Sequence, residues 1–156
     1  MYFNIIDIMK KTVVSTNRKA YHEFHILENF EAGIQLKGSE VKSIREGSVS
    51  LKQSYIVTRG GEAWIKALHI PSYSHTGYDG HDPLRNRKLL LHKREILKID
   101  AKLAEKGLTA VPTKLYFKGG LVKIELGLAK GKKLYDKRAS KKRRDVERDI
   151  QRALKK

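Results

Sequence analysis

Charged side chains and glycines are interspersed with apolar residues between positions 30 and 47, in the run FEAGIQLKGSEVKSIREG. Glu31 offers a carboxylate that accepts hydrogen bonds, and Lys42 and Arg45, three residues apart on a predicted helix, can contact phosphate groups. The sequence contains no nucleophile–base pair and no nucleotide-binding glycine motif. These residue types therefore predict a binding surface and no enzymatic activity.

A second group of residues, His75, Asp79, His81 and Asp82, could ligate a metal ion, because imidazole and carboxylate are common ligands. The surrounding stretch 70–83 is rich in proline, glycine and small polar residues, and such residues also populate ordinary solvent-exposed loops. A metal-dependent nuclease, the alternative, would also need paired carboxylates on rigid elements, which the sequence does not offer. We therefore favour an ordinary loop and predict no metal and no other cofactor.

The elements that must hold the first group follow from its hydrophobic pattern. Apolar residues alternate with polar ones over 30–36, which is the pattern of a half-buried strand. Ser39 is placed to cap a helix over 40–46, and Gly47 is placed to end it. The result is a tight strand-to-helix corner with a carboxylate on the strand and two cations on the helix.

Short strands dominate the rest of the chain. We expect strands over 21–27, 51–58, 63–68, 111–118 and 121–128, an irregular stretch over 12–19, and a helix that ends near residue 106. Hairpin turns are expected at Gly60-Gly61 and Gly119-Gly120. Because β-α-β spacing is absent, the sequence predicts an antiparallel α+β fold. A small closed Greek-key barrel of the OB type, with peripheral helices, fits this set better than a sandwich.

The composition indicates a polyanionic partner. The chain has 156 residues, with 34 basic and 17 acidic side chains and a net charge of +17, and nucleic acid is the polyanion that such a charge favours. A basic membrane-surface protein is the runner-up, but no strongly apolar helix face with basic flanks supports it. The chain has no cysteine, which suits a cytoplasmic protein. We expect residues 1–9 to be a dispensable extension and 10–130 to form one domain.

The C-terminal segment differs in composition from the rest. Residues 130–156 hold 13 basic and four acidic side chains, with too few apolar residues for a core of their own. Val146, Ile150, Ala153 and Leu154 nevertheless recur at the spacing of one helical stripe. We expect a tail over 131–156 that is disordered alone and folds as a helix against RNA. The alternative is a solvated basic tail that raises affinity without specificity.

Four blocks of the sequence resemble the SsrA-binding protein (small protein B) family of bacteria. They are NRKA at 17–20, FEAGIQLKGSEVKSIREG at 30–47, DPLRNRKLLLHKREI at 82–96 and AKGKKLYDKR at 129–138. The blocks occur in the family's order and spacing, and the resemblance covers the chain from about residue 10 to the C-terminus. Together they are highly specific. The segment before Met9 is the one clear departure, and it puts the start site in doubt.

The resemblance implies both a fold and a function. It implies a six-stranded barrel related to the OB type that binds the tRNA-like domain of transfer-messenger RNA and brings this RNA to ribosomes stalled on messages without a stop codon. The protein would stand where the anticodon arm of a tRNA lies. Its basic tail would enter the decoding centre and the empty message channel as a helix. A monomer, one per RNA, without a membrane partner, is expected.

The resemblance also assigns residues by position. It implies an RNA-binding face lined by ten residues: Asn17, Arg18, Lys19, Glu31, Gly33, Lys37, Gly38, Glu40, Lys42 and Arg45. It implies that the ribosome-binding tail begins with a basic hinge and a segment at the decoding centre: Lys130, Lys132, Lys133, Tyr135, Asp136, Lys137 and Arg138. The stripe of Val146, Ile150 and Leu154 is assigned to the tail from its spacing, because beyond Arg138 the family resemblance lies in charge and helical stripe rather than in matching residues.

Several of these residues have structural alternatives that the sequence leaves open. Glu31 could instead pair with a lysine or arginine across the sheet. Gly33 and Gly38 could serve a bulge and a turn rather than close approach of RNA. His22 is predicted to pack beside Phe24 rather than to stack on a base. A general single-stranded RNA-binding or ribosomal OB protein is the rival function.

Overall fold

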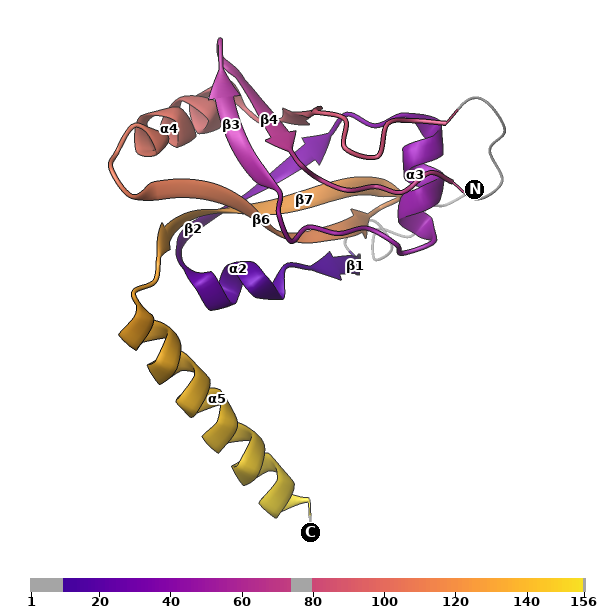
Figure 1. Cartoon of the computed structure of the whole chain (residues 1–156). Helices are drawn as coiled ribbons and strands as arrows, with labels where there is room; N and C mark the ends of the chain where they lie inside the picture. Colours follow the sequence, from indigo (N-terminus) through magenta and orange to yellow (C-terminus); the bar gives the residue numbers. More distant parts are fainter. Residues whose placement is uncertain (1–9, 74–79, 156) are drawn as a thin grey trace.

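The chain is described from a computed structural model over residues 10–73 and 80–155 (Figure 1). The seven strands of the described residues form one antiparallel sheet in the order β1-β6-β7-β2-β5-β4-β3. The strands are β1 (Lys11–Thr16), β2 (Phe24–Ile34), β3 (Tyr55–Arg59), β4 (Glu62–Lys66), β5 (Arg87–Leu90), β6 (Leu108–Lys118) and β7 (Leu121–Gly131). The helices are α2 (Arg18–Glu23), α3 (Gly38–Arg45), α4 (Lys93–Leu103) and α5 (Leu134–Leu154). The predicted antiparallel α+β class is confirmed.

The sheet differs from the predicted barrel in two respects. It has seven strands within the described residues, not six. The strands predicted separately over 21–27 and 30–36 are one continuous strand, β2, and the short segments β1 and β5 are two further strands. The order begins at β1 and ends at β3, and no ladder joins these two strands in the described part of the chain. The sheet curls so that β3 packs against β6. Closure of the barrel is therefore not confirmed.

The first strand and helix differ from the sequence prediction. Residues 12–16 of the stretch expected to be irregular belong to β1, and the rest of that stretch leads into helix α2. Residues 21–23, expected to begin a strand, also belong to α2. Asn17 explains the helix, because its Oδ1 accepts a hydrogen bond from the N–H of Ala20 at 3.1 Å and so caps the first turn. His22 consequently lies on a helix, where its Nδ1 is 3.1 Å from Nη2 of Arg144, and not on a strand face beside Phe24.

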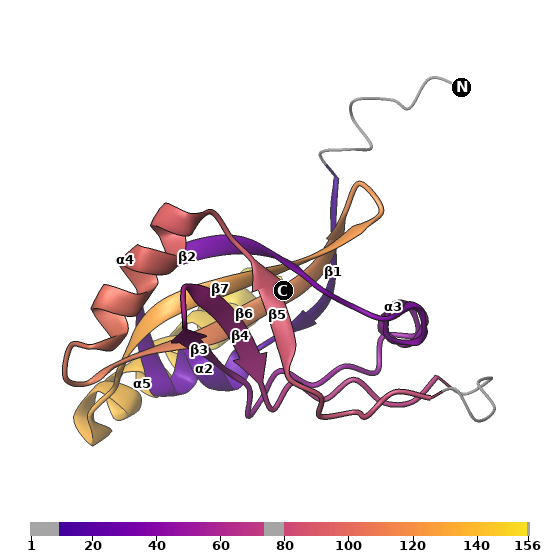
Figure 2. The same ribbon diagram turned by 90° about the horizontal axis from the view of Figure 1, so that it is seen from above.

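A single large core lies inside the curled sheet. Its fully buried side chains include Ile44 from α3, Ile99 from α4, Ile65 from β4 and Leu115 from β6. Burying each such side chain stabilises the fold by about 1.5–3 kcal/mol. Helices α3 and α4 lie at opposite ends of the sheet (Figures 1 and 2). The core therefore fixes α3, which carries the predicted cations, at the end of the sheet where β2 finishes.

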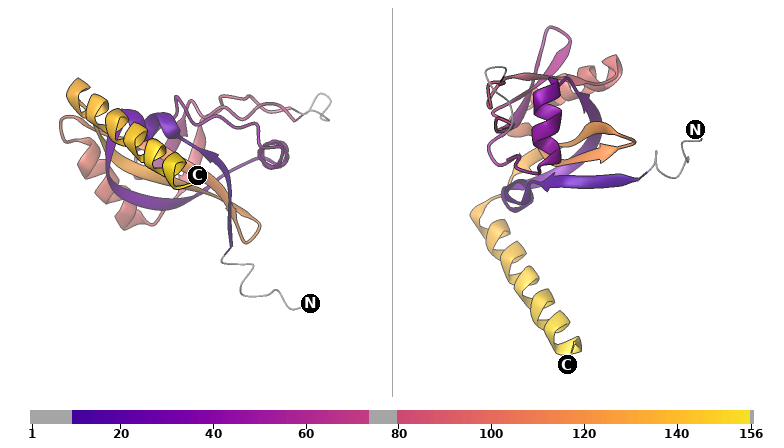
Figure 3. Two further views of the ribbon diagram at one scale, coloured as in Figure 1. Left: turned by 90° about the horizontal axis from the view of Figure 1, so that it is seen from below. Right: turned by 90° about the vertical axis from the view of Figure 1, so that its right-hand side faces the viewer.

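Helix α5 projects away from the sheet, and none of its residues is buried (Figure 3). The segment just before α5 is bonded to α2. The N–H of Lys132 donates to the carbonyl of Glu23 at 2.8 Å, and Nζ of Lys132 donates to the carbonyl of Tyr21 at 3.0 Å. The contact between Arg144 and His22 lies further along α5. The tail is thus joined to the sheet domain close to α2 and the end of β7.

Candidate nucleic-acid interface

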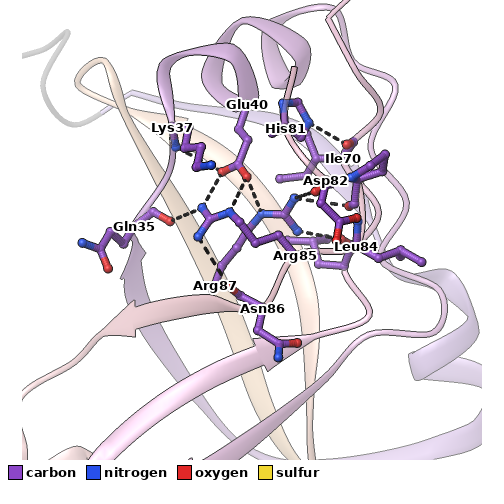
Figure 4. Close-up of polar contacts among 12 residues, drawn as sticks. Gln35, Lys37, Glu40, Ile70, His81, Asp82, Leu84, Arg85, Asn86 and Arg87 are labelled. Atoms are coloured by element: carbon purple, nitrogen blue, oxygen red, sulfur yellow. Dashed lines mark hydrogen bonds and ion pairs between the residues drawn. The ribbon is translucent and has the colours of Figure 1, made fainter. Parts of the chain in front are cut away.

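The corner between β2 and α3 is built around a buried carboxylate (Figure 4). Oε1 and Oε2 of Glu40 accept hydrogen bonds from Nε and Nη2 of Arg85 at 2.9 and 3.0 Å, and Nε of Arg87 donates to Oε1 at 3.2 Å. Oε2 also accepts from the N–H of Lys37 at 3.1 Å, which closes the first turn of α3. One carboxylate therefore joins α3 to the segment 85–87.

Burial and neighbouring charge have opposite effects on the pKa of Glu40. Its side chain and that of Arg87 are both 0% exposed. Burial raises the pKa of Glu40, but the hydrogen bonds from Arg85 and Lys37 and the charge of Arg87 outweigh this, so that its pKa lies below the ordinary value. Arg87 itself donates to the carbonyls of Leu68 and Pro83 at 2.7 and 3.2 Å. The ion pair is fully hydrogen-bonded, as a buried pair must be.

Glu40 is therefore buried and does not lie on the surface that the sequence predicts to bind RNA, in contrast to the prediction. It lies beneath the face and holds Arg85, whose side chain remains 29% exposed and whose Nη2 is 3.4 Å from the carbonyl of Gln35. Ser39, expected to cap α3, lies within the helix, and its Oγ is 2.9 Å from Nδ1 of His81. The capping residue is Lys37, which is exposed.

The outer face of α3 carries the two predicted cations. Nζ of Lys42 lies 5.7 Å from the ring centroid of Tyr73. The guanidinium of Arg45, an exposed residue, lies 5.9 Å from the ring centroid of Phe117 on β6. Such cation–π contacts restrain long side chains without neutralising their charge. The helix therefore presents both cations to solvent in restrained positions.

Glu31 forms a cluster on the outer face of the sheet. The Tyr116 hydroxyl donates to its carboxylate, and Nζ of Lys118 and Nζ of Lys11 lie at 3.0 and 3.3 Å from it. The Tyr116 hydrogen bond, with smaller contributions from both lysines, outweighs burial and lowers the pKa of Glu31 to about 2. The structural alternative, pairing with lysine across the sheet, is thus what the structure shows. An ionised carboxylate at this place remains able to accept from further donors.

Gly33, two residues along β2, lies in an open groove of about 1020 Å³. A Cβ atom at this position would lie 3.2 Å from Cβ of Leu90 on β5, closer than most Cβ contacts in proteins. The strand pairs regularly there, so that the glycine serves close packing rather than a bulge. A Cβ added at Gly38 would meet no atom within 4 Å, so packing among the described residues does not require a glycine there. The groove also receives Lys88 and Lys123.

The predicted residues of α2 lie apart from this corner. Asn17 is buried, and its Nδ2 donates to the carbonyls of Leu51 and Pro112 at 3.1 and 2.9 Å, so it is a structural cap. Arg18 and Lys19 are exposed on α2, and Figures 1–3 place this helix well away from α3. The structure thus divides the ten predicted residues into a β2–α3 group, a separate α2 group and two buried supports.

The predicted tail residues lie along the attachment and the exposed surface of α5. Lys130 lies near the end of β7, whereas Lys132 binds the carbonyls of α2 described above. Asp136 accepts from the N–H of Lys133 at 3.2 Å and lies 3.5 Å from Nε2 of His25. Five large apolar side chains are at least half exposed along this segment: Leu134, Tyr135, Val146, Ile150 and Leu154. Lys137 and Arg138 follow the first of them on the first turns of the helix.

The loop considered as a possible metal site falls partly outside the described residues, because His75 and Asp79 lie there. His81 is buried, and its two ring nitrogens lie 2.9 Å from Oγ of Ser39 and 2.8 Å from the carbonyl of Ile70. Asp82 accepts from the N–H of Leu84 at 3.0 Å. Over 10–73 and 80–155, no three His, Cys, Asp or Glu side chains gather as metal ligands would. His81 therefore has a structural role.

Sequence reasoning alone missed Arg85 and Arg87 as parts of the site. Both occur in the basic run 85–88, and a run of charged residues is usually exposed to solvent. Their carboxylate partner, Glu40, lies more than 40 residues earlier in the sequence. The apolar run at 89–91, directly after these charges, was the one available signal that this segment is a strand.

No described helix is long and apolar enough to span a membrane.

Comparisons with known proteins identify the family of this chain. A family model described as SmpB protein matches residues 14–156. An SsrA-binding protein of Carboxydothermus hydrogenoformans is 56% identical over 142 residues, which are 91% of this chain and 95% of the relative, and one of Persephonella marina is 56% identical over 92% and 94%. A solved structure described as "tmRNA-SmpB: a journey to the center of the bacterial ribosome" is 48% identical, with a TM-score of 0.67 over 77% of this chain and 85% of the other. The chain therefore belongs to the SmpB family.

Proposed function

We propose that this protein binds the tRNA-like domain of transfer-messenger RNA and delivers that RNA to stalled ribosomes, where incomplete proteins are tagged by trans-translation. The observation that carries this conclusion is the similarity to SsrA-binding proteins at above 50% identity, which extends over both the sheet domain and the basic tail. The protein is a binding factor and not an enzyme. It acts in the cytoplasm as a monomer, with one copy per RNA.

The β2–α3 corner is the proposed RNA-binding face. Lys37, Lys42 and Arg45 supply phosphate contacts from α3, and such contacts position RNA rather than specify its sequence. Glu31 supplies a fixed, ionised acceptor for base amino groups or ribose hydroxyls. Glu31 and Gly33 both line the groove of about 1020 Å³, and the absence of a side chain at Gly33 leaves room for RNA to approach the strand. This face would recognise the shape of the RNA, because the core and Glu40 hold the cations of the corner and the Glu31 acceptor in fixed positions.

Residues 10–130 form the proposed RNA-binding domain, and we assign it an OB-like barrel architecture. The packing of β3 against β6 supports this assignment, because it brings β3, at one end of the strand order, close to the strand next to β1 at the other end. Arg18 and Lys19 on α2 are proposed to make additional RNA contacts. OB-type barrels bind nucleic acid on an outer strand face, as this corner would.

Residues 131–156 are the proposed ribosome-binding tail. With no buried residue along α5, this segment lacks the packing that stabilises most protein helices, so the free tail should be only marginally helical. The ribosomal message channel would supply that packing. Lys130, Lys132 and Lys133 act as the hinge, and Tyr135, Asp136, Lys137 and Arg138 enter the decoding centre. The stripe of Val146, Ile150 and Leu154 would face the channel.

Substitution in the corner should weaken binding to the isolated tRNA-like domain. Arg45→Ala removes a charge-assisted phosphate contact, for which a loss of about 5- to 30-fold in affinity is expected. Glu31→Ala also frees Lys11 and Lys118, so a purely electrostatic surface would bind RNA more tightly after this change. We expect weaker binding instead, measured by fluorescence anisotropy. Lys106→Ala, an exposed cation beyond α4, is the matched control; unchanged affinity for both corner variants would move the site elsewhere.

A further inference from the structure

A second groove, of about 610 Å³, lies on the outer face of the β3–β4 hairpin. Its floor is Trp64 and Val57, which oppose each other across the two strands, and its walls include Arg59, Lys66 and Asn86. The volume falls within the range of about 300–1,000 Å³ that is usual for sites that hold small ligands or single groups. The groove is thus a shaped site rather than a flat face.

The strand register places the groove residues Val57, Arg59, Trp64 and Lys66 on one side of the sheet. Ile56 and Ile65 point into the core and are fully or almost fully buried, so the residues that alternate with them face outward. Trp64 is half-buried and lies opposite Lys88 on β5. Tyr55, opposite Lys66, is exposed and extends the aromatic surface along β3. Core packing therefore fixes the backbone beneath an aromatic floor.

The charge of the groove favours an anion. Glu62 is the only acidic residue among its described lining residues, and its Oε1 accepts from Nζ of Lys88 at 2.8 Å. Over the described residues, neither Arg59 nor Lys66 forms an ion pair or a side-chain hydrogen bond, so both charges are available. Asn86 points away from the Glu40 cluster in Figure 4 and offers an amide donor and acceptor at the groove's edge.

We propose that the Trp64 groove binds single-stranded RNA, with one unpaired base stacked on the indole and the flanking phosphates held by Arg59 and Lys66. An aromatic platform with cations at its rim is the arrangement that binds single strands, because every base has a face that can stack. The Asn86 amide can bond the edge of the stacked base. The apolar floor is too small, and the rim too basic, for a typical protein interface.

This surface is distinct from the proposed site for the tRNA-like domain. The first site depends on Glu31 and the cations of α3, none of which lines the Trp64 groove. The two grooves share only Gly60 and Glu62 at the hairpin among the described residues. The inference therefore goes beyond the proposed function and can fail independently of it.

Trp64 is the only tryptophan in the chain, so its intrinsic fluorescence reports on this groove alone. Titration of the full-length protein with hexa-adenylate at raised salt should quench that fluorescence saturably. Absence of saturable quenching would overturn the proposal. So would equal quenching by an acidic peptide such as hexaglutamate, because the surface would then be a protein-binding one.

Variants make the assignment specific. By anisotropy of labelled hexa-adenylate, Trp64→Leu should lower the affinity by about 5- to 100-fold, the usual effect of removing a stacking platform. Trp64→Phe should restore most of the affinity. The double variant Arg59→Ala/Lys66→Ala, which leaves the floor intact, should also weaken binding and reduce its salt dependence, whereas Lys106→Ala should not.

Binding of the tRNA-like domain serves as the folding control in the same experiment. Trp64→Leu should bind this domain as the unsubstituted protein does, which would separate the two surfaces. Equal losses for the folded domain and for hexa-adenylate, both in Trp64→Leu and in the Arg59→Ala/Lys66→Ala variant, would overturn the claim of a second site. Unchanged hexa-adenylate affinity in both variants would remove the groove from RNA binding altogether.

Discussion

Truncation after Lys133 should leave RNA binding substantially intact and abolish peptide tagging on stalled ribosomes. Because no residue of α5 is buried, removing it takes nothing from the core. The segment 134–156 carries ten basic and four acidic side chains, so the truncated protein loses a net charge of +6 and some non-specific affinity at low salt. Binding is measured by anisotropy on the tRNA-like domain, and tagging in a reconstituted translation system with messages that lack a stop codon.

A charge-matched variant separates the two interpretations of the tail. Val146→Ser/Ile150→Ser/Leu154→Ser keeps every charge of α5 but removes its apolar stripe, all three members of which are exposed. If the tail folds as a helix against the ribosome, this variant should tag poorly while its RNA affinity is unchanged. Normal tagging by the triple variant would reduce the tail to a basic tether, and normal tagging by the truncated protein would refute its decoding role.

Glu40→Gln should cost about 3–5 kcal/mol of the free energy of unfolding, the usual effect of leaving a buried charge without its partner. Glutamine keeps the size of the side chain but removes the charge that Arg85 and Arg87 share. Arg87 is fully buried and has no second carboxylate within ion-pair distance among the described residues. Urea unfolding, with the transition followed by Trp64 fluorescence, measures the loss.

The matched control for that measurement is an exposed ion pair of similar chemistry. Glu28 accepts from Nζ of Lys98 at 2.5 Å, but both side chains are well exposed. Glu28→Gln should therefore cost no more than about 1 kcal/mol. If Glu40→Gln cost as little as Glu28→Gln, the carboxylate would not organise α3. In that case, weakened RNA binding by the variant could not be attributed to a displaced Arg85.

The local sequence pattern was sufficient to predict the elements in which apolar residues recur at regular spacing or a glycine pair marks a turn. The alternation over 30–36 predicted the end of β2, and the hairpin at Gly119-Gly120 predicted β6 and β7. These predictions rest on which face of each element is apolar. The strand-to-helix corner and its outward cations were obtained in the same way.

Elements and roles that depend on distant partners could not be predicted in this way. Helix α2 has six residues and follows from Asn17, whose amide is held by carbonyls 34 and 95 residues away. Strand β5 has four residues and pairs with β2 and β4 in three dimensions only. A glutamate is usually exposed, and the burial of Glu40 depends on Arg85 and Arg87, which lie 45 and 47 positions later. The family resemblance located these segments but did not distinguish a contact residue from a support.

The most direct test is an anisotropy titration of the unsubstituted protein against the isolated tRNA-like domain and against an unstructured RNA of the same length, at several salt concentrations. Salt must be varied because a protein of net charge +17 binds any RNA when salt is low. We predict a preference for the folded domain that persists as salt is raised, since the β2–α3 corner holds its cations and its acceptor in fixed positions. Equal affinities that fall together with increasing salt would contradict this account and leave only a general basic RNA-binding protein.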